Sequence, residues 1–244
     1  MPLQAYYMLY IIGLGLDVNG ISLHGKKILK SADIKKIYLE NYTVEFPYST
    51  KELEKELKIK VTETSRELVE SEKIVEEARN EDVVLLVYGS PLGATTHISL
   101  VNSAKKQKVK YKILYSGSIF DAVAECGLSL YKFGKTTSLP KYTNNYKPTS
   151  FIEVIKENQK IKAHTLLLVD IGLSFENAKI ELIESDKIFE KEKVIVASQI
   201  GIKSRFYYGK LNEIPKDKIK APYCIIIPGE MSEVEEESLN NSSQ

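Results

Sequence analysis

The stretch VVLLVYGSPLGATTH, residues 83–97, joins an unbroken apolar run to a glycine-containing loop. The run Val83–Tyr88 is the clearest strand pattern in the chain, because continuous Val and Leu are typical of a strand buried on both faces of a sheet. Gly89-Ser90-Pro91 ends that strand, and a helix is predicted to begin near residues 95–96. This strand–loop–helix pattern predicts a mostly parallel α/β sheet.

The same pattern occurs twice more in the first half of the chain. Met8–Ile12 is an apolar run that leads into the loop Gly13–Leu16, and Tyr111–Tyr115 leads into Ser116–Ile119. The carboxyl ends of parallel strands share one edge of a sheet, and ligands of open α/β proteins bind at that edge. Glycines allow the backbone to approach a ligand closely, so three such loops favour a pocket over three unrelated tight turns.

The second half of the chain predicts a different sheet. Its strand-like runs are Thr165–Ile171, Val194–Ser198, Ser204–Gly209 and Tyr223–Ile227. The second and third runs lie too close in sequence for a crossover helix, so they are predicted to form an antiparallel hairpin. We therefore expect two α/β domains, residues 1–116 with a mostly parallel sheet and residues 117–244 with a mixed sheet.

Two further segments give local expectations. Ile119–Phe133 is predicted to be a single apolar helix stopped by Gly134, and the acidic tail Glu230–Gln244 is expected to fray.

Composition excludes several classes of protein. The chain has 43% hydrophobic and 27% charged residues, as a soluble globular protein does, and no apolar run approaches the roughly 20 residues of a membrane span. Lys and Arg number 34 against 33 Asp and Glu, so bulk charge does not indicate a nucleic-acid partner. The lysine run 105–112 is interpreted as a solvated turn in preference to an RNA contact. Cys126 and Cys224 are expected to be reduced core thiols of a cytoplasmic protein.

The sequence gives little support to metal or nucleophilic chemistry. The three histidines, His24, His97 and His164, show no metal-ligand spacing, and no metal site is expected. His97 is interpreted as a structural hydrogen-bonding residue. Asp170 is interpreted as a turn cap.

Nucleotide-binding motifs are incomplete or absent. Gly13-x-Gly15 is followed by Val18 where a dinucleotide motif has glycine, and no glycine loop leads into a P-loop lysine. Glu40 is suitably spaced for a ribose, but a lone Glu at a strand end is ordinarily solvated.

Five segments, taken in order, resemble the diphthine synthase family, which has the tetrapyrrole-methylase fold. They are MLYIIGLGL, GSPLGATTH, SGSIFDAVAECGLSLYKFGKTTSLP, HTLLLVDI and PYCIIIPG, and they extend from Met8 to about Gly229. The long middle segment is quite specific, whereas GLGL is not. The family begins at the position of Met8, so residues 1–7 are expected to be an extension or to follow from an upstream start codon.

This resemblance implies a homodimeric, S-adenosylmethionine-dependent N-methyltransferase built from two α/β domains with the cofactor in a cleft between them. The implied substrate is elongation factor 2, at a histidine that already carries an aminocarboxypropyl group, in diphthamide biosynthesis. No membrane or nucleic-acid partner is implied. No catalytic residue is assigned, because the cofactor supplies the reactivity and the protein supplies alignment and exclusion of water.

The family's cofactor contacts, carried over by position, fall on Leu16, Ser90, Gly93, Ser118, Ile119, Val169, Ile200 and Tyr223. Five of these depart from the family pattern: the family has Asp at the position of Ser90, Val at Gly93, Leu at Val169, Ala at Ile200 and His at Tyr223. Loss of a charge-assisted hydrogen bond from that Asp would cost about 1.5–3 kcal/mol, or about tenfold or more in affinity.

Two alternatives to this function remain. One is a methyltransferase of the same fold that acts on a tetrapyrrole or on ribosomal RNA, which the lysine run 105–112 favours. The other is a non-catalytic dimeric binding protein with a degenerate cofactor site, which Ser90 favours.

Overall fold

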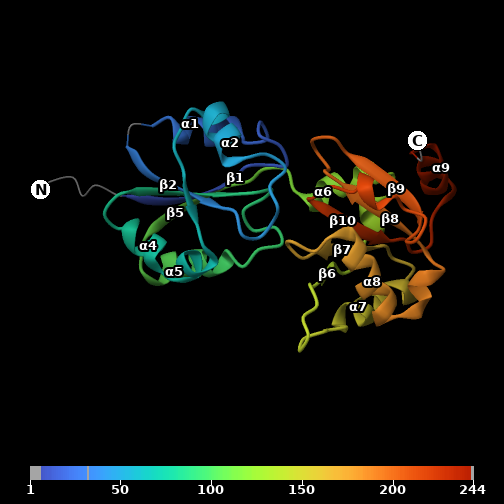
Figure 1. The fold of residues 1–244 in the computed structure, drawn as a ribbon. Helices are drawn as coiled ribbons and strands as arrows, with labels where there is room; N and C mark the ends of the chain where they lie inside the picture. The colour runs from blue at the N-terminus through green and yellow to red at the C-terminus, as the bar shows by residue number, and fades with distance from the viewer. Residues whose placement is uncertain (1–6, 32, 243–244) are drawn as a thin grey trace, which may run out of the picture. The chain divides into compact units, whose positions relative to one another are not determined.

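A computed structural model describes residues 7–31 and 33–242 of the chain. The chain divides into two compact units, Met1–Phe120 and Asp121–Gln244, each with its own sheet (Figure 1). The expected extension of residues 1–7 lies, apart from Tyr7, outside the described residues.

The sheet of the first unit is entirely parallel, with the strand order β3-β2-β4-β1-β5. Its strands are β1 Met8–Gly13, β2 Ile34–Glu40, β3 Thr62–Thr64, β4 Asp82–Val87 and β5 Lys110–Leu114. Central β4 is buried throughout Val83–Val87, which accounts for its continuous apolar sequence. The predicted parallel sheet is confirmed.

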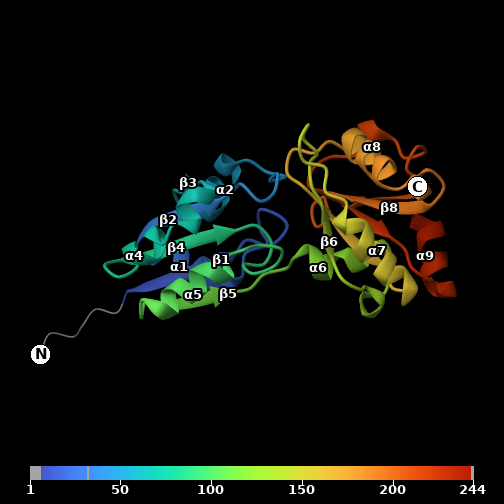
Figure 2. The ribbon, with the colours of Figure 1, turned by 90° about the horizontal axis from the view of Figure 1, so that it is seen from below.

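Helices cover both faces of this sheet (Figures 1 and 2). They are α1 Leu23–Leu29, α2 Thr50–Leu57, α3 Arg66–Glu70, α4 Lys73–Glu77 and α5 Ile98–Lys106. One core cluster includes Leu29 of α1 and Leu53 of α2, and the other includes Ile74 of α4 and Leu100 of α5. The sheet is therefore the middle of three layers.

The sheet of the second unit is mixed, with the order β6-β7-β10-β8-β9. Its strands are β6 Thr137–Leu139, β7 Thr165–Val169, β8 Lys193–Ser198, β9 Arg205–Lys210 and β10 Tyr223–Ile227. Only β6 and β7 pair in parallel, and β8 and β9 form the expected hairpin. The predicted mixed sheet is confirmed. The last strand along the chain, β10, is the middle strand of the sheet.

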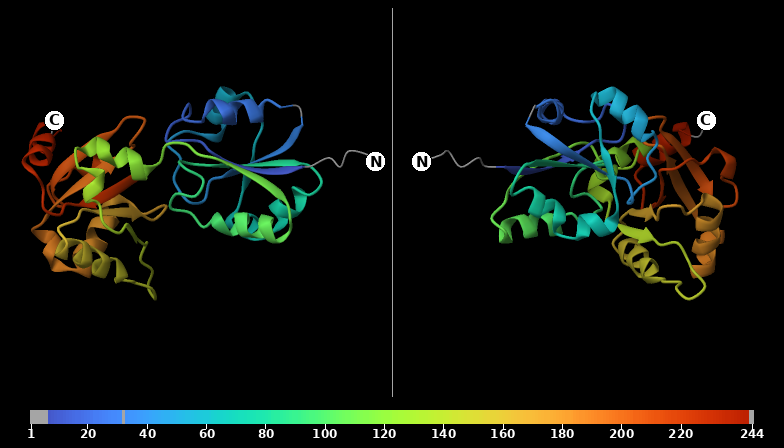
Figure 3. Two further views of the ribbon diagram at one scale, coloured as in Figure 1. Left: turned by 180° about the vertical axis from the view of Figure 1, so that it is seen from behind. Right: turned by 60° about the vertical axis from the view of Figure 1, so that its left-hand side comes forward.

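Helices α7 Ser150–Lys160 and α8 Phe175–Ser185 pack against one face of this sheet (Figure 3). Their buried residues Phe151, Ile155 and Leu182 join one core with Val196 of β8 and Ile225 of β10. The remaining helices are α6 Ile119–Ala122, α9 Glu233–Ser242 and four 3-10 helices, Val123–Cys126, Leu130–Lys132, Lys187–Glu190 and Lys216–Lys218.

Two local expectations are wrong. The single helix over 119–133 is replaced by α6 and two 3-10 helices, because Gly127 adopts φ 95° and turns the chain so that both Cys126 and Leu128 are buried. The described part of the tail does not fray over its length: α9 forms there, and its residues Glu235 and Leu239 are buried, while residues 243–244 lie outside the described residues.

None of the helices in the described part of the chain combines the length and apolar character needed to cross a bilayer.

Candidate functional site

Three loops leave the same edge of the parallel sheet in the first unit. Strand β1 pairs in parallel with β4 and with β5, so that Gly13 lies opposite Val87 and Ile12 lies opposite Leu114. Loops that follow strands paired in this way emerge side by side. The prediction that the three loops share one edge is confirmed.

The first two loops are joined by their backbones at glycines. The amide of Gly89 donates to the carbonyl of Gly15 at 2.9 Å, and the amide of Gly15 donates to the carbonyl of Gly89 at 3.2 Å. A Cβ on Gly13 would lie 2.6 Å from the Gly89 oxygen and 2.9 Å from Cδ of Pro91. Both Gly15 (φ 74°) and Gly89 (φ 69°) are left-handed. Glycine is therefore required where these loops meet.

The third loop packs against the second. A Cβ on Gly89 would lie 3.8 Å from Cα of Ser118, and a Cβ on Gly93 would lie 3.6 Å from the ring of Phe120. Ser118 and Ile119 are half-buried, as are Ser90 and Gly93. The structure therefore brings these four predicted site residues to one edge of the sheet.

Leu16, the fifth predicted residue of this unit, is held by a tyrosine that sequence reasoning missed. The Tyr88 hydroxyl donates to the Leu16 carbonyl at 2.8 Å. The Tyr88 ring packs against Phe46, at 5.2 Å between ring centroids. Burial raises the pKa of Tyr88 well above its usual value, so the hydroxyl remains a neutral donor. No local pattern could have indicated this contact, because 72 residues separate the two partners.

His97 fastens the second loop from inside the unit. Its Nδ1 donates to the Pro91 carbonyl at 3.1 Å, and the Thr95 hydroxyl donates to the same oxygen at 3.1 Å. The His97 side chain is buried, and its Nε2 has no hydrogen-bond partner among the described residues. The prediction that His97 is a structural hydrogen-bonding residue is confirmed, and the structure adds that the loop it holds is Gly89–Gly93.

The other three predicted residues lie at one edge of the second sheet. Val169 ends β7, Tyr223 begins β10 opposite Ser198, and Ile200 follows the end of β8. The Tyr223 hydroxyl donates to the Leu173 carbonyl at 2.8 Å. The Ile200 side chain is buried, which leaves mainly its backbone to meet a ligand.

Two carboxylates that follow strands have structural roles. Glu40 is fully buried and accepts hydrogen bonds from the amides of Tyr42 and Thr43 and from the Thr43 hydroxyl, so the expectation of a solvated Glu is wrong. Asp170 accepts from the amides of Ile171 and Lys141, so the expected turn cap is confirmed.

The two cysteines are buried and unpaired, as expected. Burial raises the pKa of Cys224 to about 12, so its thiol stays protonated. Within the described ranges 7–31 and 33–242, no group of three or more His, Cys, Asp or Glu side chains is placed to hold a metal ion.

The loop edge of the first unit suits a ligand that carries its own reactive group. Its glycines bring the loop backbones close together without side chains between them, and it carries the hydroxyl-bearing residues Ser90 and Ser118. Such groups can bind and orient a polar molecule. The residues present therefore fit a nucleoside cofactor with hydroxyl, amino and carboxylate groups.

Comparison with known proteins identifies the family. The model for tetrapyrrole (corrin/porphyrin) methylases matches residues 8–215. The chain belongs to the tetrapyrrole methylase family. The expected fold and the resemblance to diphthine synthases are both confirmed.

Individual members of the tetrapyrrole methylase family give more detail. A diphthine synthase from Methanococcus maripaludis is 37% identical over 250 residues, which cover 95% of this chain and 97% of the relative. A diphthine methyl ester synthase from Schizosaccharomyces pombe is 42% identical over 197 residues, covering 78% of this chain and 68% of the relative. A crystal structure of diphthine synthase matches with a TM-score of 0.88 at 29% identity, over 97% of this chain and 96% of that chain.

Proposed function

We propose that the chain is an S-adenosylmethionine-dependent methyltransferase that methylates the modified histidine of elongation factor 2 in diphthamide biosynthesis. The observation that carries this proposal is the 37% identity to a diphthine synthase over nearly the full length of both chains. We place the reaction in the cytoplasm and expect the active form to be a homodimer, whose mass light scattering would measure.

The proposed cofactor contacts come from two groups of residues. The first unit contributes the loop residues Leu16, Ser90, Gly93, Ser118 and Ile119, and the second contributes Val169, Ile200 and Tyr223. The paired glycine loops support the first group, because they present backbone rather than bulky side chains at the sheet edge.

The chain's own residues have a limited task in this chemistry. S-adenosylmethionine supplies a methyl group on a sulfonium, which an amine can displace directly. The fixed loops bind and orient the reactants and exclude water from them. We assign no side-chain base, because an uncharged amine needs only to lose a proton to solvent or to a neighbouring carbonyl after attack.

We propose nitrogen as the methyl acceptor. The diphthine synthase of M. maripaludis aligns over 95% of this chain at 37% identity, whereas the diphthine methyl ester synthase of S. pombe aligns over 78% at 42% identity, so coverage and not identity favours the first. The second name specifies an ester, in which the methyl group is on a carboxylate oxygen. Mass spectrometry of the methylated factor before and after mild base distinguishes the two, because base removes an ester methyl and leaves N-methyl groups in place.

Two measurements test the function. Calorimetric titration with S-adenosylhomocysteine should give micromolar or tighter binding, and labelled methyl should transfer to elongation factor 2 that carries the aminocarboxypropyl group. Binding without transfer to this factor would contradict the proposed substrate. Labelled methyl in ribosomal RNA would establish the RNA alternative, and undetectable cofactor binding would favour the non-catalytic one.

A further inference from the structure

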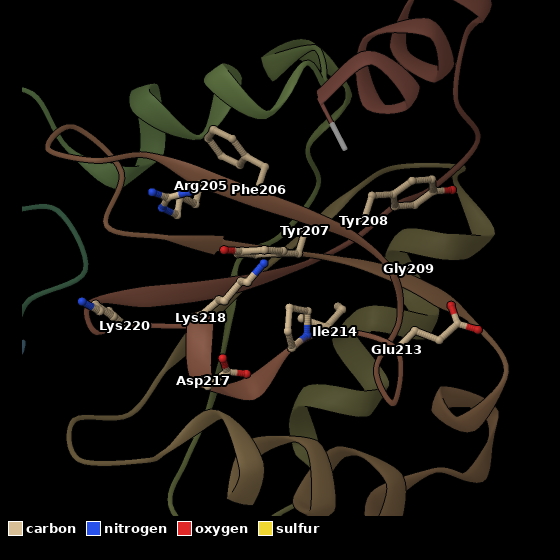
Figure 4. A pocket seen from close by; sticks show the side chains of 11 residues that line it. Arg205, Phe206, Tyr207, Tyr208, Gly209, Glu213, Ile214, Asp217, Lys218 and Lys220 are labelled. Atoms are coloured by element: carbon tan, nitrogen blue, oxygen red, sulfur yellow. The ribbon is translucent and has the colours of Figure 1, made fainter. Parts of the chain in front are cut away.

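A groove of about 570 Å³ lies between strand β9 and the segment 213–220 of the second unit (Figure 4). Its volume is within the range of about 300–1,000 Å³ that is common for ligand pockets. In the described part of the chain, β9 pairs with β8 on one side and with no strand on the other. The groove therefore follows a sheet edge with which no described strand pairs, and at the end of that edge Glu213 bonds both the backbone amide and the carbonyl of Lys210.

Three cations line one end of this groove. Arg205 comes from β9, and Lys218 and Lys220 come from the opposite wall; all three are exposed. Figure 4 shows them at the same end, with the Lys218 side chain directed toward Tyr207. None of the three has an ion-pair partner among residues 7–31 and 33–242. No ion pair of the described residues therefore neutralises these three charges.

The cationic end is fixed next to the proposed cofactor residues of this unit. The Ser198 hydroxyl donates to the Lys220 carbonyl at 2.7 Å and accepts from the Lys220 amide at 3.0 Å. The backbone amide of Gln199 donates to the Pro222 carbonyl at 2.8 Å. Ile200 and Tyr223 directly follow these fastened residues. Lys220, one of the three cations, therefore lies close in the fold to Ile200 and Tyr223.

We propose that the groove docks an extended acidic segment of the protein substrate. This inference rests on the proposed function, in which the methyl acceptor is a protein side chain. The free edge of β9 suits main-chain pairing with an extended segment, and Arg205, Lys218 and Lys220 suit its carboxylates. Tyr207 and Ile214 provide an apolar surface between them.

The composition of the groove favours an acidic peptide over RNA. Glu213 and Asp217 also line it, and they would repel a polymer with a phosphate at every nucleotide. A peptide can place separate carboxylates at the cationic end and neutral residues beside the acids.

The test replaces the three cations by glutamine in one variant, Arg205→Gln with Lys218→Gln and Lys220→Gln. Its matched control replaces three exposed lysines of the first unit, Lys27→Gln with Lys51→Gln and Lys55→Gln. KM and kcat are measured with precursor-bearing elongation factor 2, and S-adenosylhomocysteine affinity is measured by calorimetry. In parallel, fluorescence anisotropy records binding of a labelled peptide of alternating Glu and Val at low and high salt, with oligouridine as competitor.

The groove variant should raise KM for the factor about tenfold and weaken peptide binding to a similar extent, with kcat and cofactor affinity within about twofold of the original. The control variant should match the original chain, and salt should weaken peptide binding. An unchanged KM and unchanged peptide affinity in the groove variant would overturn the docking inference, as would displacement of the peptide by oligouridine. If the original chain transfers no methyl to the factor, the proposed function fails, and the peptide measurement alone decides the inference.

Discussion

His164 donates from Nε2 to the carboxylate of Glu235 at 3.1 Å, and both side chains are buried. The other ring nitrogen of His164 accepts from the Gly229 amide at 2.8 Å, so the ring is neutral with its proton on Nε2. Glu235 also accepts from the Lys132 ammonium at 2.6 Å and from the Ser129 amide at 2.9 Å. Helix α9 is thereby fastened to residues more than 100 positions earlier in the chain.

The Glu235→Gln variant should lower the free energy of unfolding by about 2–4 kcal/mol. The amide keeps the shape of the carboxylate but cannot accept all of its hydrogen bonds, and it leaves the Lys132 ammonium without its buried counter-charge. Urea denaturation followed by circular dichroism measures the loss. Glu237→Gln is the matched control, because Glu237 is exposed on the same helix. A loss of similar size in both variants would contradict a specific role for Glu235.

The same pair should make the stability of the second unit sensitive to acid. Burial alone would raise the pKa of Glu235, but its hydrogen bonds outweigh burial and hold that pKa far below the usual 4.5. Burial lowers the pKa of His164 below 6.5, against the opposing effect of Glu235. Folding favours the deprotonated form of both groups, so both stabilise the folded state fully above pH 6.5. The contribution of His164 decreases as the pH falls below 6.5. The contribution of Glu235 decreases below pH 4.5.

Thermal unfolding between pH 8 and 4 measures this effect. The midpoint should fall as pH decreases below about 6.5, and the His164→Gln variant should have a lower midpoint with a weaker dependence between pH 7 and 5. An equal slope in both proteins over that interval would show that another group is responsible.

His97 offers a matched pair of substitutions for the loop it fastens. Asparagine places its amide nitrogen near the position of Nδ1, whereas glutamine reaches toward the position of Nε2. His97→Asn should therefore keep the hydrogen bond to Pro91 and bind S-adenosylhomocysteine within about threefold of the original chain. His97→Gln should lose about tenfold, because that hydrogen bond is worth on the order of 1 kcal/mol and the loop shifts without it. Calorimetry that finds equal affinity in both variants would exclude a positioning role.

Gly13→Ala should destabilise the first unit by about 1–3 kcal/mol. The new methyl group would lie 2.6 Å from the Gly89 carbonyl, and the two loops would have to separate. Gly209→Ala is the control, because its Cβ would meet only the Glu213 carboxylate, at 3.5 Å. The midpoints of chemical denaturation of the two variants should differ clearly. Equal midpoints would contradict the close contact between Gly13 and the Gly89 carbonyl.

Ser90→Asp tests whether the departure from the family pattern weakens the cofactor site. The carboxylate can restore a charge-assisted hydrogen bond, so S-adenosylhomocysteine should bind about tenfold more tightly, with Ser90→Asn as a neutral control of similar size. A gain in both variants would indicate that shape, not charge, limits binding.

The sequence predicted the first sheet and its loop edge well because the relevant signals are local. Val83–Val87 is buried on both faces and therefore consists of apolar residues alone. Once three such strands pair in parallel, their hydrogen-bonded register places the loops that follow them at the same edge of the sheet. The hairpin of β8 and β9 was predicted in the same way, because only a few residues separate the two strand patterns in the sequence.

Features that depend on distant partners could not be predicted. Glu235 stands among other acids in the sequence, and only His164 and Lys132, far away along the chain, make it a buried anchor. The hydrogen bond from Tyr88 to Leu16 and the convergence of Arg205 with Lys218 likewise leave no local pattern. The helix expected over 119–133 was wrong because the burial of Leu128 competes with helical continuity at Gly127.

The position of β10 at the centre of its sheet has a consequence for synthesis on the ribosome. The first unit has all its strands once residue 114 has emerged, and it can fold while translation continues. Until residues 223–227 emerge, the pair β6–β7 and the hairpin β8–β9 are separate ladders with exposed inner edges. A chain stalled before Tyr223 therefore presents a finished first unit joined to two unpaired strand edges, which is a form that chaperones and proteases recognise.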